Sequence, residues 1–378
     1  MKQIEADRVV RVWDLPTRLF HWLLVLSVSG ALVTGLVAPT TWLDVHIYVG
    51  YTIFGLIIFR LVWGFFGGHF SRFRSFSYSP FRVIEHLQSL IRLRPQHYLG
   101  YNPSGSAMIL LLFVALGGLT VTDLMVLGGE NKQGFLSGIM TYATGHNARE
   151  VHEPLAYVLM VMVAVHIIGV AVESILTRQN LVGSMATGDK RVPVDMNVAA
   201  PVHPRRLAAS VCLLAIVLMA GPVILLLARM PPLGVPNIPM DSLYARECGD
   251  CHYAYSPSLL PESSWRGLMA TLEDHFGEDA TLEPSDRVKI EKWLVVFAAE
   301  HWDTRAANRF RAVSKQAPWE ITATPYWQRK HRNIAKAVFA QKNFLNKGNC
   351  IACHLDADTG RFDVQSVSIP EDRQSERK

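Results

Sequence analysis

The feature that most constrains this chain is an apolar run at residues 152–176 that contains two histidines. The run is long enough to cross a bilayer, for which about 20 apolar residues suffice. His152 and His166 are 14 residues apart, and in a helix this spacing keeps one face while advancing about 21 Å. Because ionisable groups inside a membrane span are costly and usually functional, we expect one imidazole at each of two membrane depths. The alternative is two unrelated histidines, one interfacial and one packed against a neighbouring helix.

The rest of the chain is rich in further spans. Half of the 378 residues are hydrophobic and the mean hydropathy is +0.18, which is too apolar for an ordinary soluble protein. The first span is too long for a cleavable signal peptide and follows a structured-looking segment. Five windows have membrane-spanning character: residues 19–38, 46–66, 107–127, 152–176 and 207–228.

The distribution of Lys and Arg predicts the orientation of these spans. The N-terminal tail, the loop after the second span and the loop before the fifth span together hold 14 Lys and Arg residues. The loops after the first and third spans hold only Lys132 and Arg149. This bias places the N-terminus in the cytoplasm and everything after the fifth span on the outer side of the membrane. The formal net charge of +5 lies entirely before residue 242. The basic balance therefore reflects topology in a lipid membrane and indicates no nucleic-acid partner.

Four histidines then pair by depth. His21 lies at the cytoplasmic end of the first span and His46 at the outer end of the second. The fourth span enters from outside, so His152 is its outer histidine and His166 its inner one. Iron porphyrins with two imidazole ligands need one nitrogen on each face, and helix bundles supply such sites from facing helices. The pattern predicts two non-covalent haems b, an inner one at His21 and His166 and an outer one at His46 and His152.

Arg60 is a charged residue inside the second span. It follows His46 by 14 residues and so shares its face, at the depth of the inner pair. We expect it to contact a propionate of the inner haem. The alternative is that it extends to the cytoplasmic surface.

The C-terminal third carries a second kind of site. C-x-x-C-H is the attachment signature of c-type haem, in which both thiols bond to the porphyrin and the histidine lies beneath the iron. A zinc site or disulfides are the alternative. Covalent attachment takes place outside the bacterial cytoplasm, in agreement with the charge distribution, whereas Cys212 in the fifth span is expected to be a small apolar residue. The two motifs are Cys248, Cys251 and His252, and Cys350, Cys353 and His354.

Several segments of the first half resemble the bacterial cytochrome b561 family, which includes the b-type subunit of nickel-iron hydrogenases. They are PTRLFHW, FRLVWGFFGG, YNPSG and the His152/His166 pair, and the resemblance spans about residues 8–190. It implies a four-helix core that binds two haems b through histidines of the first, second and fourth helices, here His21, His46, His152 and His166. It also implies electron exchange with quinones, although the sequence holds no specific quinone motif.

The C-terminal segments ECGDCHYAYSPSLLP, SSWRGLM, HFGEDATL, ITATPYWQRKHR and NCIACH resemble a diheme cytochrome c over about residues 240–365. This resemblance implies that His275 and His331 are the distal ligands, His275 for the first haem c and His331 for the second. It leaves His301 at the surface. Met269 is the competing ligand, since Met/His ligation would raise the potential.

These observations predict an all-α protein in four parts. Residues 1–190 form a b561-like membrane domain, residues 191–229 add a fifth helix at 207–228, residues 230–241 form a Pro-rich linker, and residues 242–378 form a periplasmic, mostly helical diheme cytochrome c domain.

The predicted function is electron transfer between the quinone pool and a soluble periplasmic acceptor, such as a small cytochrome, through two haems b and two haems c. No G-x-G-x-x-G dinucleotide fingerprint is present, so the electron source is expected to be a quinol. This would make the chain the electron-transfer subunit of a quinol:cytochrome c-type oxidoreductase; the direction of flow and an oligomeric state remain open. The alternatives are a haem-based redox or gas sensor with an open haem c site, and a transporter, which would leave the histidines unexplained.

Overall fold

The computed structural model describes residues 7–38, 42–76, 78–94, 96–193, 226, 229–237, 239–341 and 347–369. The expected fifth span at 207–228 and Cys212 lie outside the described residues, apart from Leu226. The chain forms two compact units, one made of Met1–Asp123 and Ala148–Leu225, the other of Leu124–Asn147 and Leu226–Lys378.

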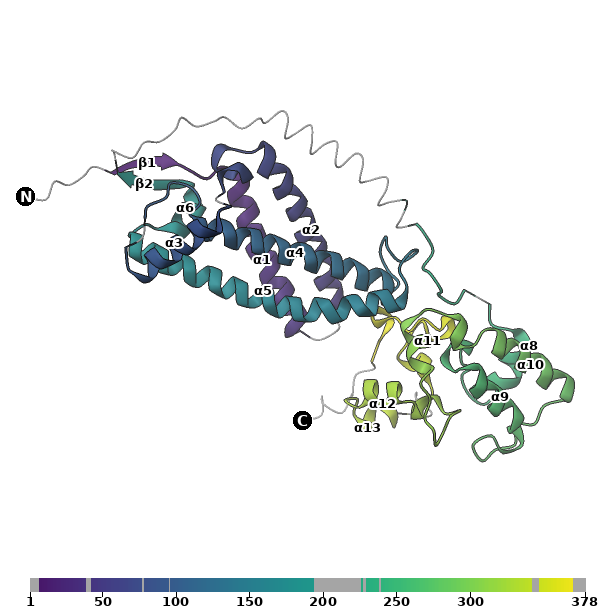
Figure 1. Ribbon diagram of the computed structural model, residues 1–378. Coiled ribbons are helices and arrows are strands. Elements are labelled where there is room, and N and C mark those ends of the chain that lie inside the picture. The colour runs from purple at the N-terminus through teal and green to yellow at the C-terminus, as the bar shows by residue number, and fades with distance from the viewer. Residues whose placement is uncertain are drawn as a thin grey trace, which may run out of the picture. The chain divides into compact units, whose positions relative to one another are not determined.

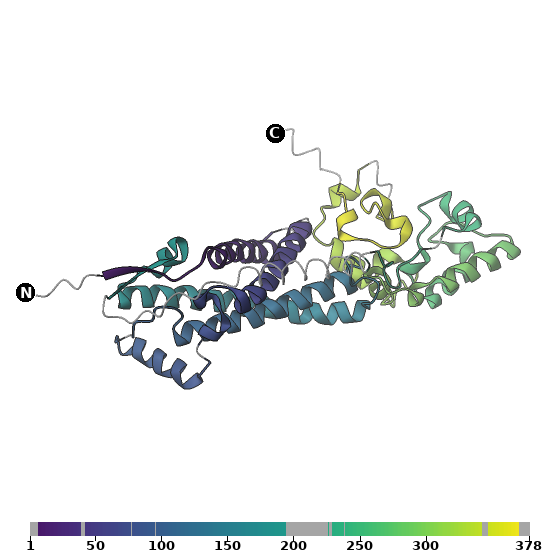
Figure 2. The ribbon, with the colours of Figure 1, turned by 90° about the horizontal axis from the view of Figure 1, so that it is seen from above.

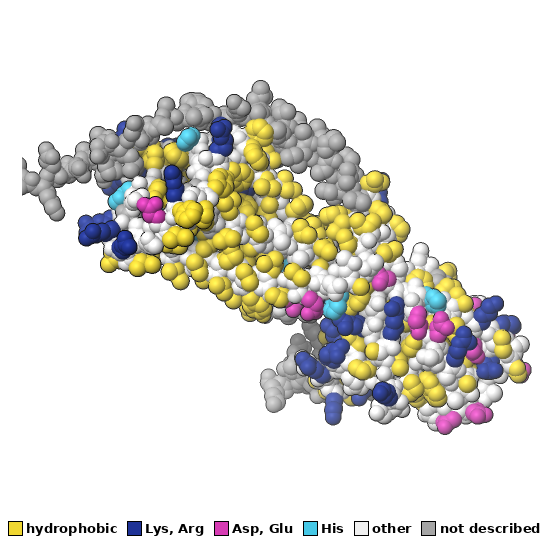
Figure 3. All heavy atoms as spheres, in the orientation of Figure 1, with side chains coloured by type: hydrophobic (Ala, Val, Ile, Leu, Met, Phe, Trp, Pro, Cys, Tyr) yellow, Lys and Arg dark blue, Asp and Glu magenta, His cyan; other side chains and the backbone are white. Residues whose placement is uncertain are grey.

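Four long helices dominate the first part of the chain (Figures 1 and 2). Each is long and apolar enough to cross a membrane, which confirms the four membrane-length helices expected before residue 190. Few of their large apolar side chains are buried, and Figure 3 shows hydrophobic side chains over this surface; lipid is the solvent that suits such a surface. The helices are α1 (Leu15–Leu36), α2 (Leu43–Phe66), α4 (Pro103–Gly129) and α5 (Tyr142–Thr177).

The buried side chains of this bundle are small and medium apolar residues that meet between the helices. Gly118 on α4 permits a close approach, because a Cβ there would lie 3.0 Å from Leu155 of α5. Helices in membranes pack through such small residues. The core consists of Val28, Ile53, Ile57, Ala115, Leu116 and Leu159.

Helix α5 begins ten residues before the expected span, at Tyr142 instead of His152. Its first turns have the sequence YATGHNARE, whose polar residues a hydropathy window excludes. Pro154 lies inside the helix, where it lacks an N–H to donate. The apolar span is thus only the second part of a longer helix.

The remaining elements before residue 194 are short. The two strands pair antiparallel, from Asp7 opposite Pro193 to Arg11 opposite Asp189, and add a small sheet to the all-α class that the sequence predicted. Asp14 caps α1 by accepting a hydrogen bond from the Thr17 amide. The elements are β1 (Asp7–Arg11), η2 (His69–Ser71), η3 (Phe73–Ser75), α3 (Pro80–Ile91), α6 (Leu181–Thr187) and β2 (Asp189–Pro193).

The C-terminal part is helical, as expected, and is built around one apolar core. That core includes Leu259, Trp265, Met269, Ile290 and Leu294, each no more than 3% exposed. Its helices are α8 (Ser242–Gly249), α9 (Glu262–Ala270), α10 (Pro284–Val296), α11 (Arg305–Phe310), α12 (Pro325–His331) and α13 (Lys336–Phe339). Short 3₁₀ turns lie between these helices and after the last of them: η4 (Pro257–Leu259), η5 (Leu272–Asp274), η6 (Ala299–His301), η7 (Ile321–Ala323), η8 (Cys350–Ala352), η9 (Ala357–Thr359) and η10 (Val364–Ser366).

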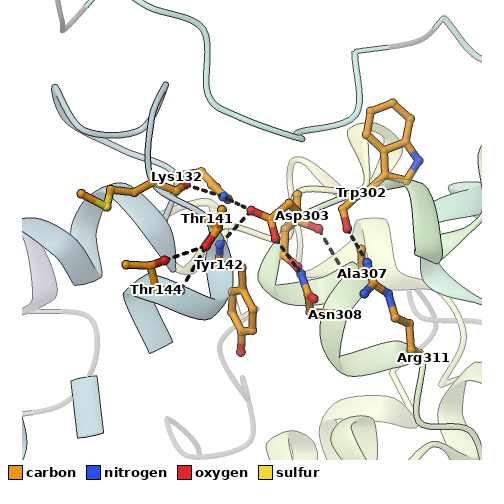
Figure 4. A network of polar contacts seen from close by, with 11 residues as sticks. Lys132, Thr141, Tyr142, Thr144, Trp302, Asp303, Ala307, Asn308 and Arg311 are labelled. Atoms are coloured by element: carbon orange, nitrogen blue, oxygen red, sulfur yellow. Dashed lines mark hydrogen bonds and ion pairs between the residues drawn. The ribbon is translucent and has the colours of Figure 1, made fainter. Parts of the chain in front are cut away.

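The segment Leu124–Asn147, which joins α4 to α5, belongs to the same compact unit as this core. The Lys132 side chain is 3% exposed, and its Nζ lies 2.6 Å from Asp303 Oδ2. The same Asp303 oxygen accepts a hydrogen bond of 2.7 Å from the Tyr142 amide, as Figure 4 shows. Arg305 reaches Glu130 in the same region, at 3.4 Å. The Asp303 carboxylate and the Arg305–Glu130 ion pair therefore both attach the segment to the C-terminal core.

We expect Asp303→Ala to lower the free energy of unfolding of this unit by about 3 kcal/mol, because it leaves the buried Lys132 ammonium with the Met140 carbonyl and without the Asp303 carboxylate. Lys132→Met should cost less, since Asp303 is 29% exposed and keeps the Tyr142 amide. The double variant should recover part of the loss seen with Asp303→Ala, because it removes the stranded charge. Thermal unfolding in detergent measures the order of stability of the three variants. A double variant less stable than Asp303→Ala would contradict this prediction.

Candidate haem sites

The outer pair of histidines lies between α2 and α5. The ring centroids of His46 and His152 are 6.4 Å apart, with planes at 80°. When two imidazoles bind one metal from opposite sides, each metal–nitrogen bond is about 2 Å and each nitrogen lies about 1 Å from its ring centroid. The two ring centroids are then about 6 Å apart. Gly35 of α1 makes room for His46, because a Cβ there would lie 3.0 Å from the His46 Cε1. The two rings are therefore spaced to hold one metal between them.

The surroundings of this pair distinguish a haem from a bare ion. Asp123 of α4 has its carboxylate close to both rings, with ligand atoms of all three residues within 4.8 Å of one another. Two histidines and a carboxylate can bind iron directly. The pocket that they share is lined mostly by apolar side chains, however, including Val28, Leu32, Leu116 and Leu159. An extended apolar wall suits a macrocycle better than a hydrated cation.

The inner pair consists of His21 on α1 and His166 on α5. His21 Nδ1 is buried and has no hydrogen-bond partner among the described residues.

Arg60 lies on α2 and is 2% exposed. Its guanidinium carbon lies 4.9 Å from the Phe73 ring centroid, and Nη1 and Nη2 have no hydrogen-bond partner in the described part of the chain. A buried guanidinium with unpaired N–H groups is costly, and a carboxylate would satisfy both nitrogens. This environment fits a haem propionate and disfavours the alternative that Arg60 extends to the surface.

The first C-x-x-C-H motif begins in the last turn of α8. His252 and His275 are stacked with ring centroids 6.0 Å apart. His252 Nδ1 lies 2.8 Å from the Tyr253 carbonyl, and a bond donated to that carbonyl leaves Nε2 for a metal. His275 is presented by a tight turn in which Phe276 and Gly277 both have positive φ. Burial, together with the nearby His252, lowers the pKa of His275, which favours the neutral imidazole that metals bind.

The second motif histidine also faces another histidine, but the ring planes are at 70° here and at 25° in the first site. His331, at the end of α12, and His354 have ring centroids 6.2 Å apart. His331 Nδ1 lies 2.9 Å from the Trp327 carbonyl, and the Trp327 ring stacks on it at 4.3 Å. Burial and the neighbouring His331 lower the pKa of His354 to about 4, so its imidazole is neutral at pH 7. The motif thiols of both sites, Cys248, Cys251, Cys350 and Cys353, are free.

Comparison with known proteins agrees with these two kinds of site. Residues 12–188 match the family described as prokaryotic cytochrome b561, and residues 244–362 match the dihaem cytochrome c family. The chain joins a cytochrome b561 region to a dihaem cytochrome c region. The two families imply haem b and haem c as cofactors and membrane electron transfer as the function, and thus confirm the resemblances inferred from the sequence.

Among curated proteins, the b561 region is similar to two described as probable Ni/Fe-hydrogenase B-type cytochrome subunits. The one from Bradyrhizobium diazoefficiens is 26% identical over 217 residues, which is 48% of this chain and 86% of the relative. The one from Azotobacter vinelandii is 25% identical over 223 residues, or 50% and 90% of the two chains.

Among solved structures, the dihaem region is similar to two diheme cytochromes c. The one from Shewanella baltica is 35% identical and covers 35% of this chain and 95% of its own, with a TM-score of 0.28. The one from Rhodobacter sphaeroides is 38% identical and covers 33% and 98% of the two chains, with a TM-score of 0.29.

Two tyrosines that follow the first motif link it to the second. The Tyr253 hydroxyl donates to the Ala357 carbonyl, just after the second motif, and the Tyr255 hydroxyl donates to the Gly348 carbonyl, just before it, at 2.9 Å. These two bonds hold the segment after the first motif against the residues on either side of the second motif.

The other candidate ligands of the dihaem region lie apart from these pairs. Met269, the competing distal ligand, is 1% exposed within the apolar core. His301 is a surface residue whose Nε2 lies 3.2 Å from Glu262.

Sequence reasoning missed Asp123 as part of the outer b561 site. A position so near the end of an apolar window would suggest the membrane interface, whereas the Asp123 carboxylate lies close to His46 and His152. An acidic residue four positions from the end of an apolar window carries no signal that separates these two placements. The rotation of α4, which only packing determines, decides between them.

Proposed function

We propose that this protein carries electrons between the membrane quinone pool and a soluble periplasmic carrier, with two haems b and two haems c. The observation that carries the proposal is the repeated pairing of histidines. Three pairs have ring centroids 6.4, 6.0 and 6.2 Å apart, near the separation for two imidazoles on one metal. When bound, haem iron supplies reversible one-electron chemistry.

The residues proposed for each site follow from these pairs. His21 and His166 would bind the inner haem b, with Arg60 at a propionate, and His46 and His152 the outer one. In the dihaem region, the proximal His252 would pair with His275 and the proximal His354 with His331. Their thioether partners would be Cys248 and Cys251, and Cys350 and Cys353.

Two further features support a single electron-transfer protein. The segment joining α4 to α5 belongs to the compact unit that holds both C-x-x-C-H motifs. The Lys/Arg distribution and the need for periplasmic haem attachment both favour an inner-membrane protein with a cytoplasmic N-terminus and a periplasmic C-terminal domain. The proposed partners are therefore a lipid-soluble quinone and a small periplasmic cytochrome.

A sensor with an open haem c site is the competing function. It requires one iron without a sixth ligand, whereas each motif histidine faces a second imidazole. This arrangement favours electron transfer.

Quinol oxidation tests the proposal. We expect anaerobic addition of a soluble quinol, such as duroquinol, to the oxidised purified protein to reduce the b-type absorbance bands and then the c-type bands. His301→Ala, at the protein surface, should behave like the wild type. The proposal fails if dithionite reduces the haems but the quinol does not, and carbon monoxide binding to the reduced haem c would favour the sensor.

A further inference from the structure

The two outer histidines share a feature beyond their spacing. The His46 Nδ1 lies 2.9 Å from the Oγ1 of Thr34 on α1. The His152 Nδ1 lies 2.9 Å from the Oγ1 of Thr122 on α4. Each proposed ligand thus meets one threonine hydroxyl, and in both cases the hydroxyl comes from a neighbouring helix.

The surroundings of the hydroxyls determine which atom donates. A hydroxyl has one hydrogen. Thr34 Oγ1 donates it to the Gly30 carbonyl at 2.7 Å, and Thr122 Oγ1 donates it to the Gly118 carbonyl at 2.9 Å. Each oxygen is then left as an acceptor for an imidazole N–H. The proton therefore lies on Nδ1 in both rings, and the Nε2 lone pair is free.

We propose that Thr34 and Thr122 are positioning residues for the outer haem b. By accepting from the Nδ1–H, they fix the tautomer and the rotation of His46 and His152. They also make both imidazoles more basic, which stabilises the oxidised iron and lowers the midpoint potential of that haem. The proposal rests on the histidine assignment made above.

The inner pair differs in this respect. His21 Nδ1 is buried and finds no hydrogen-bond partner within the described residues. Both proposed ligands of the outer haem b thus have a hydroxyl oxygen that accepts a hydrogen bond from Nδ1. Removing these hydroxyls should change the midpoint potential of the outer haem b and leave that of the inner haem b unchanged.

Substitution by valine tests the proposal, because valine keeps the shape and branching of threonine and removes the hydroxyl. We expect Thr34→Val and Thr122→Val to keep both haems b and to raise the midpoint potential of the outer one. The double variant should shift most, and the serine variants should resemble the wild type. An anaerobic redox titration, read optically and by the low-spin ferric signals, measures both haems.

Thr52→Val is the matched control. Thr52 lies on α2 and its hydroxyl bonds to the Tyr48 carbonyl of its own helix at 2.9 Å, so neither potential should change. Loss of the outer haem alone in the valine variants, restored by serine, would also support a positioning role.

Unchanged or lowered outer potentials with all haem retained, or a loss that serine does not restore, would overturn the proposal. Those outcomes leave the ligand assignment intact. Full haem content in His46→Ala would instead refute the assignment itself.

Discussion

His152→Ala should lose one haem b and keep the other, together with both haems c. The substitution removes one of the two imidazoles that face each other 6.4 Å apart. The outer haem would then depend on His46 in a mostly apolar pocket, whose described lining holds no further imidazole. His166→Ala should lose the inner haem in the same way. The pyridine haemochrome assay should report half of the wild-type haem b in each variant, with unchanged haem c.

The two variants are controls for each other, because the haem that one loses is the haem that the other keeps. His97→Ala, an exposed histidine before α4, should retain all haem. Redox titration should show that the remaining b component differs between the two variants. Wild-type haem content in both would contradict the ligand assignment.

Alanine substitution of the first motif should remove one covalent haem. The thioether bonds survive denaturation, whereas haem b dissociates, so a denaturing gel stained for haem reports haem c alone. We expect Cys248→Ala with Cys251→Ala to halve the stain, and Cys350→Ala with Cys353→Ala to halve it likewise. All four substitutions together should abolish it.

Cys212→Ala serves as the control for these variants, since it alters a cysteine outside both motifs and should leave the stain unchanged. The haem b content should persist when either motif is removed. A full stain after removal of one motif would show that this motif does not attach haem.

Much of the fold follows from local sequence. Apolar runs of membrane length identify α1, α2, α4 and α5, because a span must satisfy its backbone within the helix and bury its side chains in lipid. The polar start of α5 at Tyr142 escaped detection, because it lies outside the apolar run that a hydropathy window measures. The strand pair between Asp7–Arg11 and Asp189–Pro193 also escaped, since segments so far apart give no local sign of pairing.

In the candidate sites, too, local sequence patterns could be predicted and contacts between distant segments could not. The spacing of His152 and His166 within one helix, and the C-x-x-C-H motifs, are local patterns, so the sequence predicted them. The contacts of Thr34 and Thr122 depend on how neighbouring helices are rotated against each other, and a threonine in an apolar span is unremarkable by itself. The bond between Lys132 and Asp303 likewise joins segments whose meeting only the tertiary structure determines.

The amount of each haem type bound by the wild-type protein tests the central claim most directly. Pyridine haemochrome spectra of the purified chain, taken before and after acid–acetone extraction, separate non-covalent haem b from covalent haem c. The paired histidines and the two motifs predict equal amounts, two of each per chain. A spectrum with haem c but no extractable haem b would contradict the account, because the histidines of the membrane helices would then hold no iron.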